Sequence, residues 1–377
     1  MNSVYHPGDI VLGNWELKRL IGEGSFGKVF EAERKEFDVV FKSAIKAVSF
    51  PSQHDESILD EMDEADRVAS LRCSLKGFMQ ILALMQKLSG SGNIVSQADH
   101  AIIEHKDSIG WDIIIRMELL TPLPEYLREA ALSRDEIIKI GIDLCKALEI
   151  CQRYNIIHRD IKPSNIFVSE SGAFKLGDFG FARLGEASVM RNDLRRGFCT
   201  YMAPEMWSGE PYGGSVDVYS LGVMLYSLLN DNRPPFLPIF PAPVTMTEQE
   251  GAFTRRMKGE KLPPPKNADW QLASIVCKAC AYRWKDRFES PAEMRKALED
   301  AATMSYRPSG GIIPNPPWNH MDGPTVDPFD SPNTGVMLQK NDTIQDGEMP
   351  EKCSDRKDES TDLPLRDTKQ ELEDYTT

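Results

Sequence analysis

Residues 158–165, which read HRDIKPSN, constrain this chain more than any other part of its sequence. They place a carboxylate (Asp160), a cation (Lys162) and a carboxamide (Asn165) two and three residues apart. One loop with these groups can hold a nucleophile, a phosphate and a metal ion together, because each group serves a different one of the three. The alternative is a polar turn between two apolar segments, but such a turn does not require a carboxylate, a cation and a carboxamide at this spacing. The stretch therefore indicates phosphoryl-transfer chemistry.

The full pattern H-R-D-x-K-P-x-N resembles the catalytic loop of eukaryotic-type (Hanks-type) serine/threonine protein kinases, in a form similar to bacterial members. The resemblance implies that Asp160 is the catalytic base, that Lys162 stabilises the transferred phosphoryl group, and that Asn165 binds magnesium. Lys162 at this offset is typical of kinases specific for serine and threonine. Arg159 resembles the arginine of kinases whose activation loop is ordered by phosphorylation.

Residues 15–30 are expected to form a strand, a glycine-rich turn and the start of a second strand. Rossmann folds share the G-x-G-x-x-G pattern, but there the turn opens a helix, and Val29 favours the kinase version. Glycines in such a turn let backbone N–H groups approach phosphates without interference from Cβ. The resemblance assigns the following residues to ATP: Ile21, Gly22, Glu23, Gly24, Ser25, Phe26, Gly27 and Val29.

A third strand is expected at about Val39–Phe50. Its Ala44-Ile45-Lys46 resembles the V-A-I-K motif, so Lys46 is expected to bind the α- and β-phosphates and to assist catalysis. A lysine on a strand is more often a solvated edge residue, but its place about 20 residues after the glycine turn favours the phosphate ligand. Leu17 and Ala44, together with a valine of the second strand, are expected to enclose adenine.

The next long helix departs from the family pattern. Members carry a glutamate there that pairs with the strand lysine, and the spacing puts that position at Ile81, or at Gln80 if a loop is one residue shorter. Glu61 and Glu64 follow Lys46 by 15 and 18 residues, but they lie about five turns too early in a continuous helix. The sequence therefore does not identify the acid that pairs with Lys46. A missing pair would weaken the positioning of the nucleotide.

Residues 111–120 resemble the strand that leads into the hinge between the two kinase lobes. The resemblance makes Met117 the gatekeeper beside adenine and assigns the backbone of Glu118 and Leu120 to the edge of the base. Phe167, on a short expected hairpin, is also assigned to the ATP site.

That hairpin leads to Asp178-Phe179-Gly180, thirteen residues after Asn165. A hard cation that bridges phosphates favours carboxylate oxygens, and a small glycine lets the backbone turn. Asp178 is therefore expected to be the principal Mg²⁺ ligand.

The segment after Gly180 resembles an activation loop that ends at Ala203-Pro204-Glu205. Ser188, the one hydroxyl residue between Gly180 and Thr200, is the expected phosphorylation site. Relatives usually have threonine where this chain has Phe198, so the hydroxyl that bridges the catalytic aspartate and lysine is absent unless Thr200 replaces it. We therefore hypothesise that the missing hydroxyl lowers the phosphoryl-transfer activity of this chain or changes its regulation.

Two scaffold features and one helix start are also predicted. Asp217 resembles the helix aspartate that holds the catalytic-loop backbone, and Arg287 the arginine that pairs with Glu205. Ser133 followed by Glu136 is a capping pattern that should open a helix.

Composition limits the partners of this 377-residue chain. Acidic residues outnumber basic ones 58 to 44, which argues against nucleic-acid binding. No leader-like opening and no run of about 18 apolar residues occurs, so a cytoplasmic protein without a membrane segment is expected. Seven scattered cysteines indicate reduced thiols. Cys277 and Cys280 are interpreted as core thiols, with half of a zinc site as the alternative.

The expected domain covers residues 10–301, with an N-terminal lobe at about 10–120 and a C-terminal lobe at about 121–301. Residues 302–377 hold 7 basic and 15 acidic residues, a net charge of −8, and are expected to be a disordered acidic tail. Thr343 with Asp346 resembles a phosphothreonine motif for forkhead-associated domains, although four-residue matches also arise by chance.

The fold class is therefore expected to be α+β, a two-lobed protein-kinase fold. The expected function is transfer of the ATP γ-phosphoryl group, with Mg²⁺, to Ser and Thr of proteins, including the chain itself. A pseudokinase-like nucleotide-binding scaffold is the alternative, motivated by Ile81 and Phe198. A small-molecule phosphotransferase fits less well, because Ala203-Pro204-Glu205 resembles part of a peptide platform.

Overall fold

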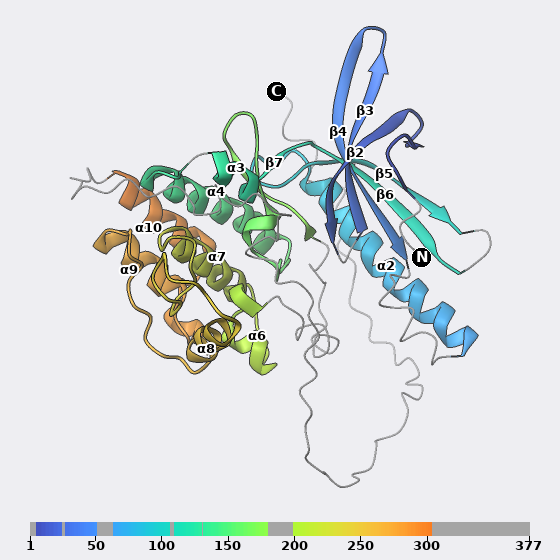
Figure 1. Cartoon of the computed structure of the whole chain (residues 1–377). Coiled ribbons are helices and arrows are strands. Elements are labelled where there is room, and N and C mark those ends of the chain that lie inside the picture. The colour runs from blue at the N-terminus through green and yellow to red at the C-terminus, as the bar shows by residue number, and fades with distance from the viewer. Residues whose placement is uncertain are drawn as a thin grey trace, which may run out of the picture. The chain divides into compact units, whose positions relative to one another are not determined.

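The computed structural model describes residues 5–24, 27–50, 63–105, 109–129, 131–179 and 199–303. Within this part, an N-terminal antiparallel sheet is followed by a helical region, so the predicted α+β class, with a β-rich first part and a helical second part, is confirmed (Figure 1). Several residues singled out in the sequence lie outside the described residues, among them Ser25, Phe26, Glu61, Ser188 and Thr343. Phe198 and almost the whole expected tail lie outside them as well.

The N-terminal sheet has the strand order β1-β2-β3-β4-β6-β5, and each neighbouring pair is antiparallel. The strand predicted at Val39–Phe50 is present with those bounds. The six strands are β1 (Ile10–Val11), β2 (Trp15–Gly24), β3 (Gly27–Glu36), β4 (Val39–Phe50), β5 (Gln97–Glu104) and β6 (Trp111–Met117).

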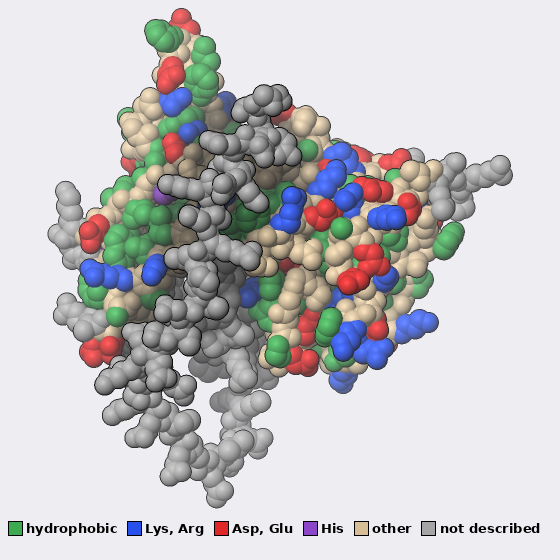
Figure 2. All heavy atoms as spheres, turned by 180° about the vertical axis from the view of Figure 1, so that it is seen from behind, with side chains coloured by type: hydrophobic (Ala, Val, Ile, Leu, Met, Phe, Trp, Pro, Cys, Tyr) green, Lys and Arg blue, Asp and Glu red, His purple; other side chains and the backbone are tan. Residues whose placement is uncertain are grey.

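The turn between β3 and β4 carries exposed apolar side chains. Phe37 is 99% exposed and Val39 55% exposed, and Figure 2 shows hydrophobic side chains at the end of this hairpin. The pairs nearest the turn, Lys35 with Val40 and Glu36 with Val39, lie past the part of β3 that pairs with β2. The end of the hairpin therefore adds little to the core.

Helix α2 (Glu64–Leu88) packs on the sheet through its C-terminal half (Figure 1). Leu82 forms a buried cluster with Val48 of β4 and Ile113 of β6. Among the described residues, Asp66–Leu88 is also long and apolar enough to span a membrane by length and composition, which is weak evidence for a single helix. Packing on the sheet is the observed use of its apolar side chains.

The helical region is built around α7 (Ser215–Leu228), in which every residue from Val216 to Leu228 is buried. Helix α4 (Arg134–Arg153) begins as predicted, since Ser133 and Glu136 bond each other's backbone N–H groups in a capping box. The other helices are α3 (Leu123–Glu129), α6 (Pro204–Ser208), α8 (Met246–Met257), α9 (Trp270–Ala279) and α10 (Pro291–Thr303).

A small three-stranded sheet, β7 (Thr121–Pro122), β8 (Ile166–Val168) and β9 (Phe174–Leu176), connects the chain after β6 to the predicted hairpin. Strand β8 directly follows the HRDIKPSN stretch, and β9 directly precedes Gly177-Asp178. The hairpin therefore carries the two sequence motifs that the kinase resemblance assigns to the metal.

Candidate active site

Helix α7 holds the backbone at the start of the HRDIKPSN loop. Asp217 accepts hydrogen bonds from the N–H groups of His158 and Arg159, both at 2.8 Å. Burial raises the pKa of Asp217, while His158 and the two N–H donors oppose that rise. Arg159 is held at a φ of 69°, a strained value for a residue other than glycine. The buried carboxylate thus fixes the path of the loop.

The three catalytic-loop side chains singled out in the sequence lie together. Asn165 donates from Nδ2 to the carbonyl oxygen of Asp160 at 2.7 Å and to its Oδ2 at 2.8 Å. Lys162 Nζ lies 3.3 Å from the same Oδ2. Both contacts hold the Asp160 carboxylate in one orientation, as a general base requires.

Lys46 on β4 lies beside Asp178, which follows β9. Its Nζ donates to Asp178 Oδ1 at 2.8 Å, and the two side chains are 15% and 31% exposed. A cation for phosphates and a carboxylate for a metal thereby meet in one place, although 132 residues separate them in the chain.

Helix α2 supplies no acid at the position that the sequence analysis left open. Its last acidic residue is Asp66, 15 residues before Ile81, which is about 22 Å along a helix. Ile81 instead packs against the hydrophobic core of the helical region. Glu64 opens the helix and Glu61 lies outside the described residues. Among the described residues, Asp178 is the acid that pairs with Lys46.

Asp178 and Asn165 fit a magnesium ion that is shared with phosphates. Gly177 N–H donates to Asn165 O at 2.9 Å, which ties the two predicted ligands together. Because Asn165 Nδ2 bonds Asp160, its Oδ1 is left as an oxygen ligand. Among the described residues no group of three or more His, Cys, Asp or Glu side chains could hold a metal. One carboxylate, one amide oxygen and phosphates are a typical set for Mg²⁺.

The end of the glycine turn at Gly27 requires a glycine. Gly27 has a φ of +114°, and a Cβ there would lie 2.0 Å from the carbonyl oxygen of Ala47, so a side chain cannot be accommodated. Val29 pairs with both Gly22 and Lys46 across the sheet. The assigned Ile21, Glu23 and Gly24 lie at the end of β2, next to this turn.

The expected adenine residues lie on three strands and the hinge. Ala44 of β4 pairs with Met117 of β6, and Leu120 precedes β7. Phe167 of β8 packs so closely that a Cβ on Gly177 would lie 2.7 Å from its ring.

One of the two backbone hydrogen-bonding groups of Glu118 in the hinge already has a partner within the protein. The Glu118 N–H donates to Ser96 O at 3.1 Å. A bond from this residue to adenine must therefore come from its carbonyl oxygen. The carboxylate of Glu118 accepts from Lys175 Nζ at 2.7 and 2.8 Å and from Ser96 N–H at 2.6 Å, which ties the hinge to β9.

The assignment of Leu17 to adenine was wrong. Leu17 is 0% exposed and packs with Trp15, Phe30 and Ile45. Neighbouring side chains on a strand point to opposite faces, so Ile45 lies on the face of β4 away from Lys46. Leu17 therefore belongs to the core on that other face.

The residues expected to regulate the site are only partly described. Arg159 Nε and Nη1 are buried and have no hydrogen-bond partner among the described residues, and the guanidinium lies 5.4 Å from the centre of the Tyr212 ring. Among the described residues, no hydrogen bond joins Thr200 to Asp160 or Lys162, so the structure does not show Thr200 replacing the missing threonine.

The predicted ion pair between Arg287 and Glu205 is present. Arg287 donates to both carboxylate oxygens of Glu205, at 2.6 and 2.7 Å, and both side chains are buried. Cys280, by contrast, is a core residue, and burial raises the pKa of its thiol.

Asp143 of α4 and Lys175 of β9 were not predicted as residues of the site. Asp143 is only 5% exposed and contacts the β8–β9 hairpin. An acid among the apolar residues of an amphipathic helix was the signal for Asp143, because a buried charge requires partners. Lys175 had no such signal, since a lysine on a short strand is usually solvated.

Comparisons with known proteins agree with this geometry. A family model for the protein kinase domain matches residues 15–300. The serine/threonine-protein kinase PknB of Mycolicibacterium smegmatis is 38% identical over 167 residues, which cover 43% of this chain and 25% of that protein. The probable serine/threonine-protein kinase PknB of Lactococcus lactis is 25% identical over 350 residues, 90% of this chain and 50% of that protein.

A third relative, the probable serine/threonine-protein kinase CPE1738 of Clostridium perfringens, is 28% identical over 297 residues, 77% of this chain and 38% of that protein. The chain thus spans between a quarter and a half of the length of these relatives.

Proposed function

The chain belongs to the protein kinase family, and from this premise we propose that it transfers the γ-phosphoryl group of ATP to Ser and Thr hydroxyls of proteins. The observation that carries the proposal is the assembly of Lys46 with Asp178 and of Asp160 with Lys162 and Asn165. The names of the bacterial relatives support serine and threonine as the acceptors.

Each residue has a physical role in this transfer. Asp160 orients the substrate hydroxyl and takes its proton while the new O–P bond forms and the bond from the γ-phosphorus to ADP breaks. Lys162 lies within 3.3 Å of Asp160 and balances the negative charge on the phosphoryl oxygens. Lys46 holds the phosphates of the nucleotide. Mg²⁺, held by Asp178 and Asn165, would neutralise charge on the β- and γ-phosphates.

One observation favours a second candidate, a nucleotide-binding scaffold with little or no transferase activity. Helix α2 has Ile81, not an acid, at the position where the kinase pattern has the glutamate that pairs with the phosphate lysine. A scaffold has no chemical reason to keep Lys46, Asp160, Asn165 and Asp178 together, which weighs against this candidate.

Incorporation of labelled γ-phosphate separates the two candidates. The full chain is incubated with labelled ATP and Mg²⁺, with itself and a generic basic protein as acceptors, beside an Asp178→Asn control. Label on Ser or Thr that disappears in Asp178→Asn supports the kinase. Magnesium-dependent nucleotide binding without any label supports the scaffold.

We further propose that phosphorylation of Ser188 regulates the site through Arg159. The support is the pair of buried Arg159 nitrogens, which find no hydrogen-bond partner in the part of the chain that the structure describes and would bind a phosphate strongly. Phosphopeptide mapping of the autophosphorylated chain should find Ser188. A Ser188→Ala variant with wild-type activity would contradict the regulatory role.

Two further proposals concern the partners and the location of the protein. Phosphorylated Thr343 would recruit a forkhead-associated domain, and mapping that never finds Thr343 modified would remove this proposal. A cytoplasmic location is supported by the free cysteines Cys145, Cys151 and Cys280, and cell fractionation tests it.

A further inference from the structure

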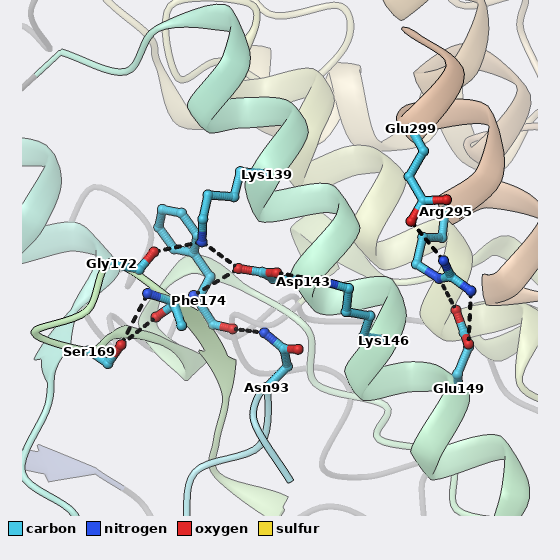
Figure 3. Close-up of polar contacts among 11 residues, drawn as sticks. Asn93, Lys139, Asp143, Lys146, Glu149, Ser169, Gly172, Phe174, Arg295 and Glu299 are labelled. Carbon is cyan, nitrogen blue, oxygen red and sulfur yellow. Dashed lines mark hydrogen bonds and ion pairs between the residues drawn. The ribbon is translucent and has the colours of Figure 1, made fainter. Parts of the chain in front are cut away.

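The backbone of Phe174, the first residue of β9, is held from two sides (Figure 3). Its N–H donates to Asp143 Oδ2 of α4 at 3.2 Å. Its carbonyl oxygen accepts from Asn93 Nδ2 at 2.9 Å. Figure 3 shows Asp143 and Asn93 approaching Phe174 from different parts of the chain. The peptide groups of Phe174 are therefore fixed by side chains outside its own hairpin.

The remainder of β9 carries this restraint toward the metal ligand. Leu176 bonds Asn93 and Val95 through its N–H and carbonyl groups, both at 2.9 Å. The Gly177 carbonyl oxygen lies 3.0 Å from His158 Nε2. Asp178 comes four residues after Phe174 and has a φ of 54°. Because β9 is short and its backbone is hydrogen-bonded along its length, a displacement of Phe174 at its start should also displace Asp178 after its end.

Asp143 can occupy this buried place because two lysines of its own helix neutralise it. Lys139 Nζ lies 2.7 Å from Oδ2 and Lys146 Nζ lies 3.3 Å from Oδ1. Lys139 also donates to the carbonyl oxygen of Gly172 at 2.6 Å and lies 5.0 Å from the centre of the Phe174 ring. Asp143 and Lys139 together hold both the turn and the second strand of the β8–β9 hairpin.

We propose that Asp143 is a positioning residue for phosphoryl transfer, which acts through the backbone of Phe174 to place the metal ligand Asp178. This inference rests on the proposed function, because it gives Asp178 its magnesium. The contacts of Asp143 in the structure are with Lys139, Lys146 and the Phe174 N–H. Its carboxylate bonds the backbone of the strand that supports the ligand, and loss of such supporting contacts commonly weakens metal binding about 10- to 100-fold.

The same helix offers a matched control. Glu149, also on α4, binds Arg295 of α10 at 2.5 Å, and Arg295 binds Glu299 at 2.7 Å (Figure 3). This cluster joins α4 to α10, and within the described part of the chain its ion pairs do not involve the β8–β9 hairpin. Glu149→Leu and Asp143→Leu therefore each remove an acid from an ion cluster of α4, but only Asp143→Leu releases β9.

Two readouts on the full chain test the proposal without depending on catalysis. The first is binding of a non-hydrolysable ATP analogue titrated with Mg²⁺. Asp143→Leu should raise the Mg²⁺ concentration at half-saturation about tenfold, while Glu149→Leu leaves it unchanged. The second is amide hydrogen exchange of residues 174–178 without nucleotide, which should accelerate in Asp143→Leu alone.

Asp143→Asn supplies a rescue test. Asparagine keeps an oxygen that can accept the Phe174 N–H, and Lys139 and Lys146 are 46% and 47% exposed and can turn to water. Its half-saturation should stay within about threefold of wild type, because a neutral acceptor still bonds the N–H. If Asp143→Leu does not fold, Lys139→Met loosens the same hairpin from the solvent side and should shift both readouts in the same direction.

A merely structural role for Asp143 predicts a different result. Asp143→Leu would then lower the thermal unfolding midpoint as Glu149→Leu does, with wild-type Mg²⁺ dependence and wild-type exchange at 174–178, and the proposal would be overturned. A wild-type chain that binds Mg²⁺ and nucleotide but transfers no phosphate would contradict the proposed kinase activity, whereas the two readouts would still decide the role of Asp143.

Discussion

Removing Arg287 should cost this protein several kcal/mol of folding stability. Its guanidinium donates to both oxygens of Glu205, at 2.6 and 2.7 Å, and the two side chains are 0% and 6% exposed. Arg287 also donates to the carbonyl oxygens of Ala281 at 2.8 Å and Ser215 at 3.0 Å. Arg287→Met leaves a buried carboxylate without its cation, which costs about 3–5 kcal/mol.

Urea unfolding of Arg287→Met, Glu205→Gln and the double variant measures this cost. The single variant Arg287→Met should lose about 4 kcal/mol of unfolding free energy and about 10 °C in its thermal midpoint. The double variant should recover part of the loss, because glutamine leaves no unpaired charge in the core. A loss below about 1 kcal/mol for Arg287→Met, or a double variant less stable than the single one, would refute the reasoning.

Three further outcomes are expected. Asp217→Asn should lower the transfer rate about 10- to 100-fold with a small change in thermal midpoint, because the single oxygen of the asparagine amide can accept from only one of the two loop N–H groups. Steady-state kinetics measures the rate, circular dichroism measures the midpoint, and an unchanged rate would contradict this prediction. The hydrogen bond from Lys42, with help from Arg19, holds the pKa of Glu31 below its ordinary value of 4.5, so the stability it contributes is complete above pH 4.5 and is lost as the pH falls. Glu31→Gln should therefore flatten the acid side of the stability curve in urea unfolding, and an unaltered curve would speak against this assignment. Phe198→Thr should raise the transfer rate by supplying the hydroxyl that the kinase pattern has at this position, and equal rates would contradict that hypothesis.

Local sequence signals predicted local structure well. The Ser133 and Glu136 pair fixed the start of α4, because a capping box depends on residues only three apart. The hairpin before Asp178 was predicted for the same reason, since alternating apolar residues and a short turn set it within about ten residues. The groups of the HRDIKPSN loop also lie together, because one short loop can hold them.

Contacts between distant segments could not be predicted in the same way. Asp178, a partner of Lys46, is separated from it by 132 residues, and no local pattern around Lys46 indicates this contact. Leu17 was misplaced because β2 contains register irregularities on either side of Leu20, which spoil a simple alternation of faces. The buried role of Asp143 likewise depends on the hairpin that folds onto α4.

The hinge contact between Glu118 and Ser96 has a consequence for compounds that compete with ATP. Because the Glu118 N–H is already used, a heteroaromatic inhibitor must present a donor, not an acceptor, to this residue. Beside it, Met117 offers a long and flexible thioether that adapts to substituents of different shape. Inhibitors in which only this donor is blocked, for example by methylation, should therefore lose more affinity than inhibitors changed at the substituent that faces Met117. The hinge would then select among inhibitors by whether they carry a donor for Glu118.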